Sequence, residues 1–292
     1  MLPPSTAAPP PERSALIAQA RREVFERAGT PASAVGMRIE PWITRSWQRC
    51  LSAGRRPQQR VSFDAVSAPH ARRTVEQNRG LVTAARPVLD RLSRAIADTR
   101  YFAILTDPHG IVVDVRGLPA NAQRPAVDLA RVGVDLSEQA VGTTAIGAAL
   151  AELQPVWLHR GEHFFDDTSL YSCAGAPLFG PDGRCVGMLD LTGVDVVERP
   201  ELRHLAALSA RSIENALVLQ QPHDLLVRLH WPGYGGGESE GLLCLDGDGH
   251  VTGSNAAARE MVNLPLALSD RPTRLHASEL FALPWTLLWD AA

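Results

Sequence analysis

The sequence contains no lysine, and all 29 of its basic residues are arginine. A phosphate-binding P-loop needs a lysine ammonium at the phosphates, and Schiff-base catalysis needs a lysine amine. Both kinds of site are therefore excluded for this chain. Cysteine is also scarce. Cys50, Cys173, Cys185 and Cys244 lie far apart and form no Cys-x-x-Cys pair, which argues against a disulfide framework and against a zinc knuckle.

Long apolar runs are missing as well. No stretch approaches the ~18 apolar residues that a membrane span needs, and the proline- and alanine-rich residues 1–13 lack the features of a secretory signal. We therefore predict a cytoplasmic protein without membrane contact, whose residues 1–13 form a disordered tail. Its 292 residues, 45% hydrophobic and 21% charged, are typical of a globular chain of about two domains.

Charge is unevenly distributed along the chain. Residues 1–100 hold 17 arginines against 8 acidic residues, whereas the remainder holds 12 against 24. A basic segment can contact nucleic acid, dock on an acidic partner or form solvated helical faces. No aromatic residues are interleaved with these arginines as in a platform for single strands. We favour solvated faces, and expect DNA contact only through a module absent from this chain.

The apolar periodicity predicts an α+β fold. Residues 14–80 have helical spacing, and Pro41 is well placed to open their second helix. Beyond them, β-rich runs joined by glycine-containing turns predict three hairpins, at 101–115, 173–191 and 241–252. A helix of small residues is expected at 141–151, and another at 255–262 with Ser254 as its N-cap.

Two amphipathic helices are expected to flank the first two hairpins. One, residues 87–99, continues an apolar stripe that starts at Leu81, and should begin near Pro87 because proline interrupts a helix. The other, residues 200–220, is opened by Pro200. We predict that a homodimer forms through these two helices.

Five short blocks resemble one known family. Ile43-x-x-Ser46-Trp47-x-Arg49-Cys50-x-x-x-Gly54 is similar to the signature of the N-terminal helical region in AcoR-like regulators, the sigma-54-dependent, Fis-type activators of acetoin catabolism and their relatives. Segments 142–147, 161–164, 173–177 and 189–193 resemble the successive GAF-domain motifs of that family. The resemblance covers residues 40–265.

The sequence departs from the family in three places. Thr144 replaces the usual asparagine, and Ala174-Gly175-Ala176 replaces Ser-Ala-Ala. Both changes are small and alter the surface that a ligand would meet. The Fis-type helix-turn-helix and the ATPase domain of the family are absent from the sequence, and the lack of lysine independently excludes the ATPase.

The resemblance implies a domain order and a function. It implies an N-terminal helical region at 14–80, a GAF-like sensor domain at 81–221, a linker at 222–240 and a partial PAS-like domain at 241–292. The chain is then the sensory part of a transcription regulator, with a small-molecule effector (an alcohol, diol, ketone or aromatic) and no cofactor. Seven residues are expected around that effector: Phe102, Thr143, Thr144, Trp157, His163, Phe164 and Cys173. Each also has a structural interpretation, such as helix capping for Thr143 or core packing for the aromatic residues.

Two other functions stay open. The chain can be a stand-alone co-regulator that acts by protein contact, or a GAF-type sulfoxide reductase that uses Cys173 and Cys185 on neighbouring strands. No Gly-x-Ser-x-Gly elbow or useful carboxylate pair occurs, so we predict that the chain is not an enzyme. His159, Glu162 and His163 lie close together, but Gly161 breaks the helix that a His-Glu-x-x-His zinc site requires, so no metal is expected.

Overall fold

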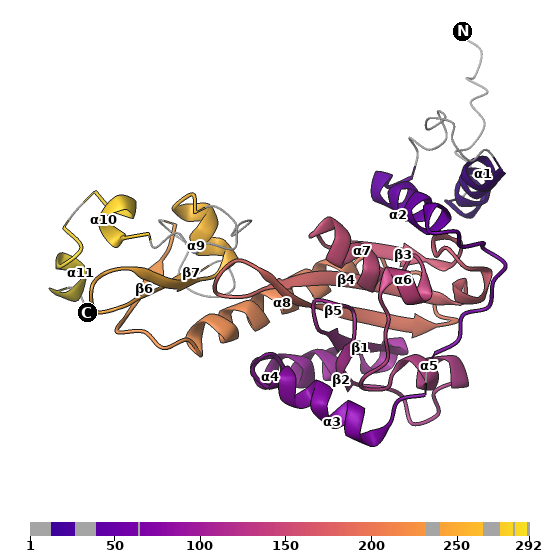
Figure 1. The fold of residues 1–292 in the computed structure, drawn as a ribbon, viewed down its shortest axis with the longest axis horizontal. Coiled ribbons are helices and arrows are strands. Elements are labelled where there is room, and N and C mark those ends of the chain that lie inside the picture. Colours follow the sequence, from indigo (N-terminus) through magenta and orange to yellow (C-terminus); the bar gives the residue numbers. More distant parts are fainter. Residues whose placement is uncertain are drawn as a thin grey trace, which may run out of the picture.

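The computed structural model describes residues 13–26, 39–63, 65–231, 240–264, 275–282 and 284–290. The predicted disordered tail, apart from Arg13, lies outside the described residues. A five-stranded antiparallel sheet forms the largest unit, and its strands follow the order β2-β1-β5-β4-β3 (Figure 1). The strands are β1 (Tyr101–Thr106), β2 (Val112–Arg116), β3 (Val156–His159), β4 (Tyr171–Phe179) and β5 (Cys185–Val194). The predicted α+β class is confirmed, and the first two predicted hairpins are β1–β2 and β4–β5.

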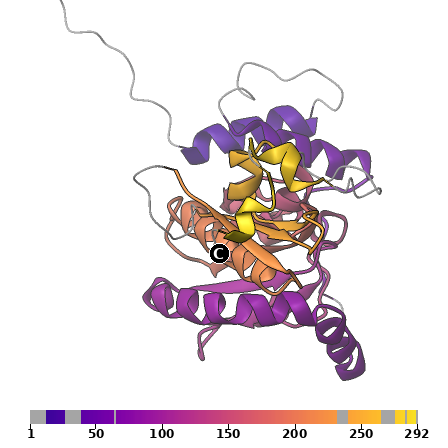
Figure 2. The same cartoon turned by 90° about the vertical axis from the view of Figure 1, so that its left-hand side faces the viewer.

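Alternating side chains give the sheet two apolar faces, because successive residues of a strand point to opposite sides. One face packs against the long helices α4 (Arg79–Ala95) and α8 (Leu202–Leu219) in one core cluster. The other face is covered by α1 (Arg13–Glu26), α2 (Pro41–Ser52), α5 (Arg124–Leu129), α6 (Glu138–Val141) and α7 (Ala145–Glu152) in a second cluster. Figures 1 and 2 show the indigo helices α1 and α2 on the opposite side of the sheet from the purple helix α4.

The N-terminal region is helical, as predicted. It contains α1 (Arg13–Glu26), α2 (Pro41–Ser52) and α3 (Ala68–Gln77). Pro41 opens α2, which confirms that prediction. The prediction that a helix begins near Pro87 is wrong, because α4 begins at Arg79 and contains Pro87. Proline has no N–H to donate to the Thr83 carbonyl, and Pro87 and Thr83 are both exposed, so this turn of the helix faces solvent.

The helix expected at 141–151 begins four residues later, as α7, and a separate short helix, α6, precedes it. Helix α6 ends at Gly142, which has φ 69° and ψ −157°, a conformation that essentially only glycine adopts. Helix α7 then begins after Thr144, whose side chain accepts a hydrogen bond from the Gly147 N–H at 3.2 Å. Thr144 is therefore an N-cap.

A smaller sheet of order β6-β7-β8 follows α8. Its strands are β6 (Leu225–Leu229), β7 (Gly241–Leu245) and β8 (Val251–Ser254), followed by α9 (Ala256–Met261), α10 (Ala277–Leu280) and α11 (Leu287–Asp290). Strand β6 lies inside the predicted linker, 222–240, and pairs along its length with β7. Its residues Leu225 and Val227 contribute to the hydrophobic core of this unit. The N-cap of α9 is Asn255 and not Ser254, since the Asn255 side chain accepts from Ala258 N at 2.8 Å.

Candidate ligand-binding site

A small buried cavity of about 30 Å³ lies on the sheet face opposite α4 and α8. It is lined by Phe63, Ile104, Leu129, Leu136, Val141, Thr144, Ala145, Ile146, His163, Thr168, Tyr171, Cys173, Asp190 and Thr192. A cavity that binds benzene measures roughly 150 Å³. The present cavity therefore suits a ligand of very few atoms.

The floor of the cavity is the central part of the sheet. Antiparallel pairing places Ile104 opposite Asp190, and Cys173 opposite Thr192. These four side chains share one face of the sheet by the alternation of strands β1, β4 and β5. The roof comes from the segment that contains α6 and α7, and one wall comes from the loop that holds His163 and Thr168.

His163 brings an unpaired acceptor to this cavity. Its side chain is fully buried, and Nδ1 lies 2.9 Å from the Arg160 carbonyl oxygen. A carbonyl only accepts, so Nδ1 carries the proton and Nε2 keeps its lone pair. Burial lowers the pKa of His163 to about 4, so the ring is neutral at pH 7. Nε2 has no hydrogen-bond partner.

Asp190 brings a second unpaired atom. Its Oδ2 accepts a hydrogen bond from the Thr192 hydroxyl, while Oδ1 is buried without a partner. Burial raises the pKa of this carboxyl to about 7 from 3.8. Buried polar atoms are nearly always paired in folded proteins. The two residues that carry these exceptions, His163 and Asp190, both line the cavity.

Cys173 lines the cavity but has the properties of an inert thiol. Burial, followed by the nearby Asp190, raises its pKa well above 9.0, and its Sγ lies 3.3 Å from Thr192 Oγ1. Cys185 pairs with Phe179 at the far end of the hairpin, six residues along β4 from Cys173. At ~3.3 Å per residue the two thiols are about 20 Å apart. The cysteine pair of the sulfoxide-reductase alternative is therefore not formed.

The structure brings three of the seven predicted site residues to the cavity, Thr144, His163 and Cys173. Phe102 belongs to the core on the same side of the sheet, and Phe164 packs against Phe25 and Phe165 at ring-centroid distances of 5.4 and 5.0 Å. Trp157 belongs to the opposite core, because it alternates with the cavity-side residues of β3. Asp190 and Thr192 were missing from the predicted set, although both lie within the block 189–193; a carboxylate in an otherwise apolar strand was the available signal.

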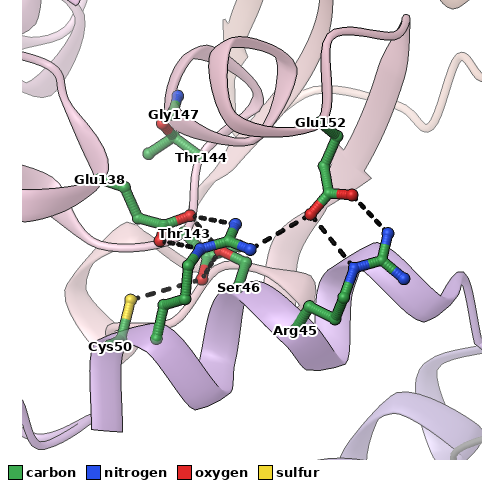
Figure 3. A network of polar contacts seen from close by, with 9 residues as sticks. Arg45, Ser46, Cys50, Glu138, Thr143, Thr144, Gly147 and Glu152 are labelled. Carbon is green, nitrogen blue, oxygen red and sulfur yellow. Dashed lines mark hydrogen bonds and ion pairs between the residues drawn. The ribbon is translucent and has the colours of Figure 1, made fainter. Parts of the chain in front are cut away.

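Thr143 has a structural role at the junction between α2 and α6 (Figure 3). Its hydroxyl lies 2.7 Å from Ser46 Oγ and 3.7 Å from Cys50 Sγ. Ser46 also donates to Glu138 Oε2 at 2.6 Å. The threonine therefore contacts the N-terminal helix and not the cavity.

Two arginines of α2, Arg45 and Arg49, form ion pairs with the segment that makes the cavity roof. Arg49 forms a bidentate ion pair with Glu138, with N–O distances of 2.7 and 2.8 Å, and also contacts Glu152 at 3.2 Å. Arg45 pairs with Glu152 as well (Figure 3). Bidentate arginine–carboxylate pairs are strong and directional. The Ser-Trp-x-Arg-Cys block of α2 thus binds both ends of the α6–α7 segment.

The loop that carries His163 is held from outside by α1 and α2. The Arg21 guanidinium donates to the carbonyl oxygens of Gly161, His163 and Phe164, and pairs with Asp166 at 2.7 Å. Trp47 Nε1 donates to the Glu162 carbonyl at 2.9 Å. The N-terminal helices therefore contact the outer side of the wall whose inner side lines the cavity. Among the described residues, no cluster of three or more histidine, cysteine or acidic side chains has the arrangement of a metal site.

Replacing Asp190 with asparagine is expected to stabilise the protein, by more at pH 8 than at pH 4.5. The folded-state pKa of about 7 exceeds the ordinary 3.8, so the native state binds more protons than the unfolded chain between these values. The contribution of the Asp190 carboxyl to the free energy of unfolding is therefore fully present below pH 3.8 and is lost as the pH rises through 7. Three pKa units correspond to at most about 4 kcal/mol. Urea unfolding of both proteins from pH 4.5 to 8 measures the difference; the contribution of His163 is common to both, and a pH-independent difference contradicts the prediction.

The fold defines a class of protein: an α+β domain whose N-terminal helices contact the roof and one wall of a small buried cavity. The chain belongs to the family of MimR N-terminal domains, since the sequence model described as "MimR, N-terminal domain" matches residues 16–215. The predicted relationship to AcoR-like regulators is thereby confirmed.

Two curated relatives are named as transcription regulators, which agrees with the prediction of a regulatory and not an enzymatic chain. The chain is 30% identical over 227 residues to the acetoin catabolism regulatory protein of Cupriavidus necator. The matched region covers 75% of this chain and 34% of that protein. It is 31% identical over 210 residues to the propane 2-monooxygenase operon transcriptional activator MimR of Mycolicibacterium goodii. This match covers 71% of this chain and 34% of the relative. The chain thus spans about a third of the length of these relatives.

A solved structure shares the fold. The N-terminal part of DhaR from E. coli, crystallised with DhaL, superimposes with a TM-score of 0.57 at 19% identity and covers 86% of this chain and 85% of that chain. Within the described part of the chain, the helices lack the length and apolar character of a membrane span.

Proposed function

We propose that this chain is the effector-sensing region of a cytoplasmic transcription regulator, and that the effector is a small neutral alcohol, diol or ketone bound in the cavity below α7. The observation that carries this proposal is that two residues with a buried, unpaired polar atom, His163 (Nε2) and Asp190 (Oδ1), line the same cavity. The names of the relatives, an activator of acetoin catabolism and one of a propane 2-monooxygenase operon, support an effector of this size. An aromatic effector, the fourth class expected from the sequence, is disfavoured by the cavity volume of about 30 Å³.

The occupied cavity would signal through the helices that touch its walls. Arg21 and Trp47 connect α1 and α2 to the His163 loop, and α8 leads from the central sheet to the smaller sheet. A ligand shifts such an equilibrium only by binding one arrangement more tightly than the other. We assign DNA binding to a module outside residues 1–292, and propose a homodimer through α4 and α8, where Leu208 exposes an apolar side chain on α8.

Calorimetric titration of the chain with small alcohols, diols and ketones tests the sensing function. We expect millimolar or tighter binding of at least one compound and its loss by at least tenfold in Ile146→Phe, because the larger ring fills the cavity. The matched control is Leu191→Phe, an equally buried substitution in the opposite core. Absence of binding by every compound, or equal loss in both variants, would contradict the proposal.

A second function is contact with a protein partner, which is favoured by one observation: the structural neighbour DhaR(N) was crystallised in complex with DhaL. In this case the exposed arginines of the N-terminal helices form the docking surface. Pull-down with acidic partner domains at low and high salt distinguishes the two functions, since buried ligand binding is insensitive to salt.

A further inference from the structure

Helix α1 is held on the domain by few apolar contacts. Of its 14 residues only Ile17 and Ala20 are buried, whereas α2 buries five of its 12 residues. A helix of this length is marginally stable in water without tertiary packing. Three surface hollows of about 510, 470 and 270 Å³ lie along α1, and each is lined in part by its side chains. The packing of α1 is therefore incomplete on several sides.

Polar contacts supply most of the remaining attachment of α1. Arg21 donates to three carbonyl oxygens of the His163 loop and pairs with Asp166 at 2.7 Å. Near the start of the helix, Arg13 pairs with Glu162, but the Arg13 side chain is 45% exposed. Ion pairs with an exposed partner contribute little, because water competes for them. The attachment of α1 to the loop depends chiefly on Arg21.

A ligand enters the cavity only when one of its walls moves. The cavity measures about 30 Å³, and His163 at its wall is fully buried. The floor is the central sheet, and the roof is joined to α2 by the ion pairs of Arg45 and Arg49. The His163 loop differs from both, since part of its outer contacts comes from the sparsely packed helix α1.

We propose that α1 is a releasable strap over the cavity. In a minor state α1 detaches, the His163 loop loses the contacts of Arg21, and this wall opens to solvent. Water then replaces the guanidinium as the hydrogen-bond donor to the freed carbonyl oxygens. An element with few buried apolar contacts opens at a lower free energy than the core of the protein. The role of the strap in admitting an effector rests on the proposed sensing function, whereas the detachment of α1 does not.

Hydrogen exchange of the full chain, followed by mass spectrometry, tests the detachment. We expect the amides of α1 to be protected at least about 100-fold less than those of α2, because α1 opens without global unfolding. Arg21→Ala should lower the protection of α1 and of the His163 loop a further ten- to 100-fold or about that, since hydrogen bonds from a charged donor are lost.

Arg22→Ala is the matched control, because Arg22 is the exposed neighbour of Arg21 on the same helix. Protection in this variant should stay within about threefold of the wild type. Equal protection of α1 and α2 in the wild type would overturn the strap, and so would equal effects of the two arginine variants.

Labelling of Cys173 by methyl methanethiosulfonate reports the opening of the cavity without any effector. Cys173 lines the cavity, whereas Cys244 is buried in the core of the smaller unit and reports opening elsewhere. Arg21→Ala should raise the labelling rate of Cys173 at least about tenfold and leave that of Cys244 within about twofold. If α1 loses protection in Arg21→Ala while Cys173 labelling is unchanged, the cavity opens at another wall, such as that of Phe63, and the proposed role of the strap is wrong.

A disulfide between α1 and the His163 loop gives the opposite change. A Cβ added at Gly161 would lie 3.5 Å from Ile17 Cγ2, so Ile17→Cys combined with Gly161→Cys brings two thiols within bonding reach. The oxidised double variant should label at Cys173 at least about tenfold more slowly than the same variant before oxidation. Equal rates would overturn the strap. None of these readouts uses an effector, so their failure leaves the sensing function to the calorimetric titration, and an absence of binding there leaves the detachment of α1 standing.

Discussion

Gly142→Ala is expected to lower the free energy of unfolding by about 3 kcal/mol or more. Gly142 has a backbone conformation with φ 69° and ψ −157°, which a residue with a side chain adopts only with strain. An added Cβ would also lie 2.7 Å from Phe165 Cε2 and 3.3 Å from Phe164 Cβ. Both phenylalanines are buried, so they have little room to move.

Urea unfolding measures this loss, and Gly80→Ala is its matched control. Gly80 lies in the first turn of α4, and an added Cβ there has no neighbour within 4 Å. Alanine at this position should stabilise the protein by about 0.5–1 kcal/mol, since it favours the helix. A Gly142→Ala protein as stable as the wild type would show that α6 and α7 can be joined differently.

Trp47→Ala is expected to destabilise the protein by roughly 3–5 kcal/mol. The Trp47 side chain is fully buried, packs against Phe25 with ring centroids 5.3 Å apart, and donates to the Glu162 carbonyl. Its removal leaves a cavity between α1, α2 and the His163 loop, together with an unpaired carbonyl. Denaturant unfolding gives the change in stability, and limited proteolysis should show faster cleavage near α1.

Two further variants serve as controls for Trp47→Ala. Trp47→Phe keeps most of the packing and loses the hydrogen bond, so its cost should be about 1–3 kcal/mol. Trp231→Ala removes a tryptophan that is 60% exposed and should change stability by less than about 0.5 kcal/mol. Equal losses of unfolding free energy in Trp47→Ala and Trp231→Ala would contradict the conclusion that Trp47 of α2 stabilises the cavity wall.

These two predictions concern the same junction. Gly142 and the Thr143–Ser46 contact set the path of the cavity roof, and Trp47 holds the cavity wall. The N-terminal helices α1 and α2 thus share a hydrophobic core with the unit that holds the cavity. A change in the cavity wall reaches α1 and α2 through direct hydrogen bonds, of which the three Arg21–carbonyl contacts are the clearest.

The sequence alone determined the fold class, the two central hairpins and the start of α2, because these depend on local rules. Strand alternation, glycine-containing turns and an N-terminal proline act over a few residues and leave a readable pattern. The family relationship was also visible, since its motifs are short and contiguous. Thr144, His163 and Cys173 were found through those motifs.

Only the tertiary structure decided which side chains share the cavity. The strand register places the side chains of Asp190 and Thr192 on the cavity face of the sheet, and that of Trp157 in the opposite core. A shift of the register by one residue would reverse the face on which each side chain lies. It also decided that Thr143 pairs with Ser46, 97 positions away. Contacts of this kind depend on how distant segments pack, for which local sequence carries no signal. The same reason explains the unpaired atoms of His163 and Asp190: a buried group lacks a partner only because of what the folded chain places around it.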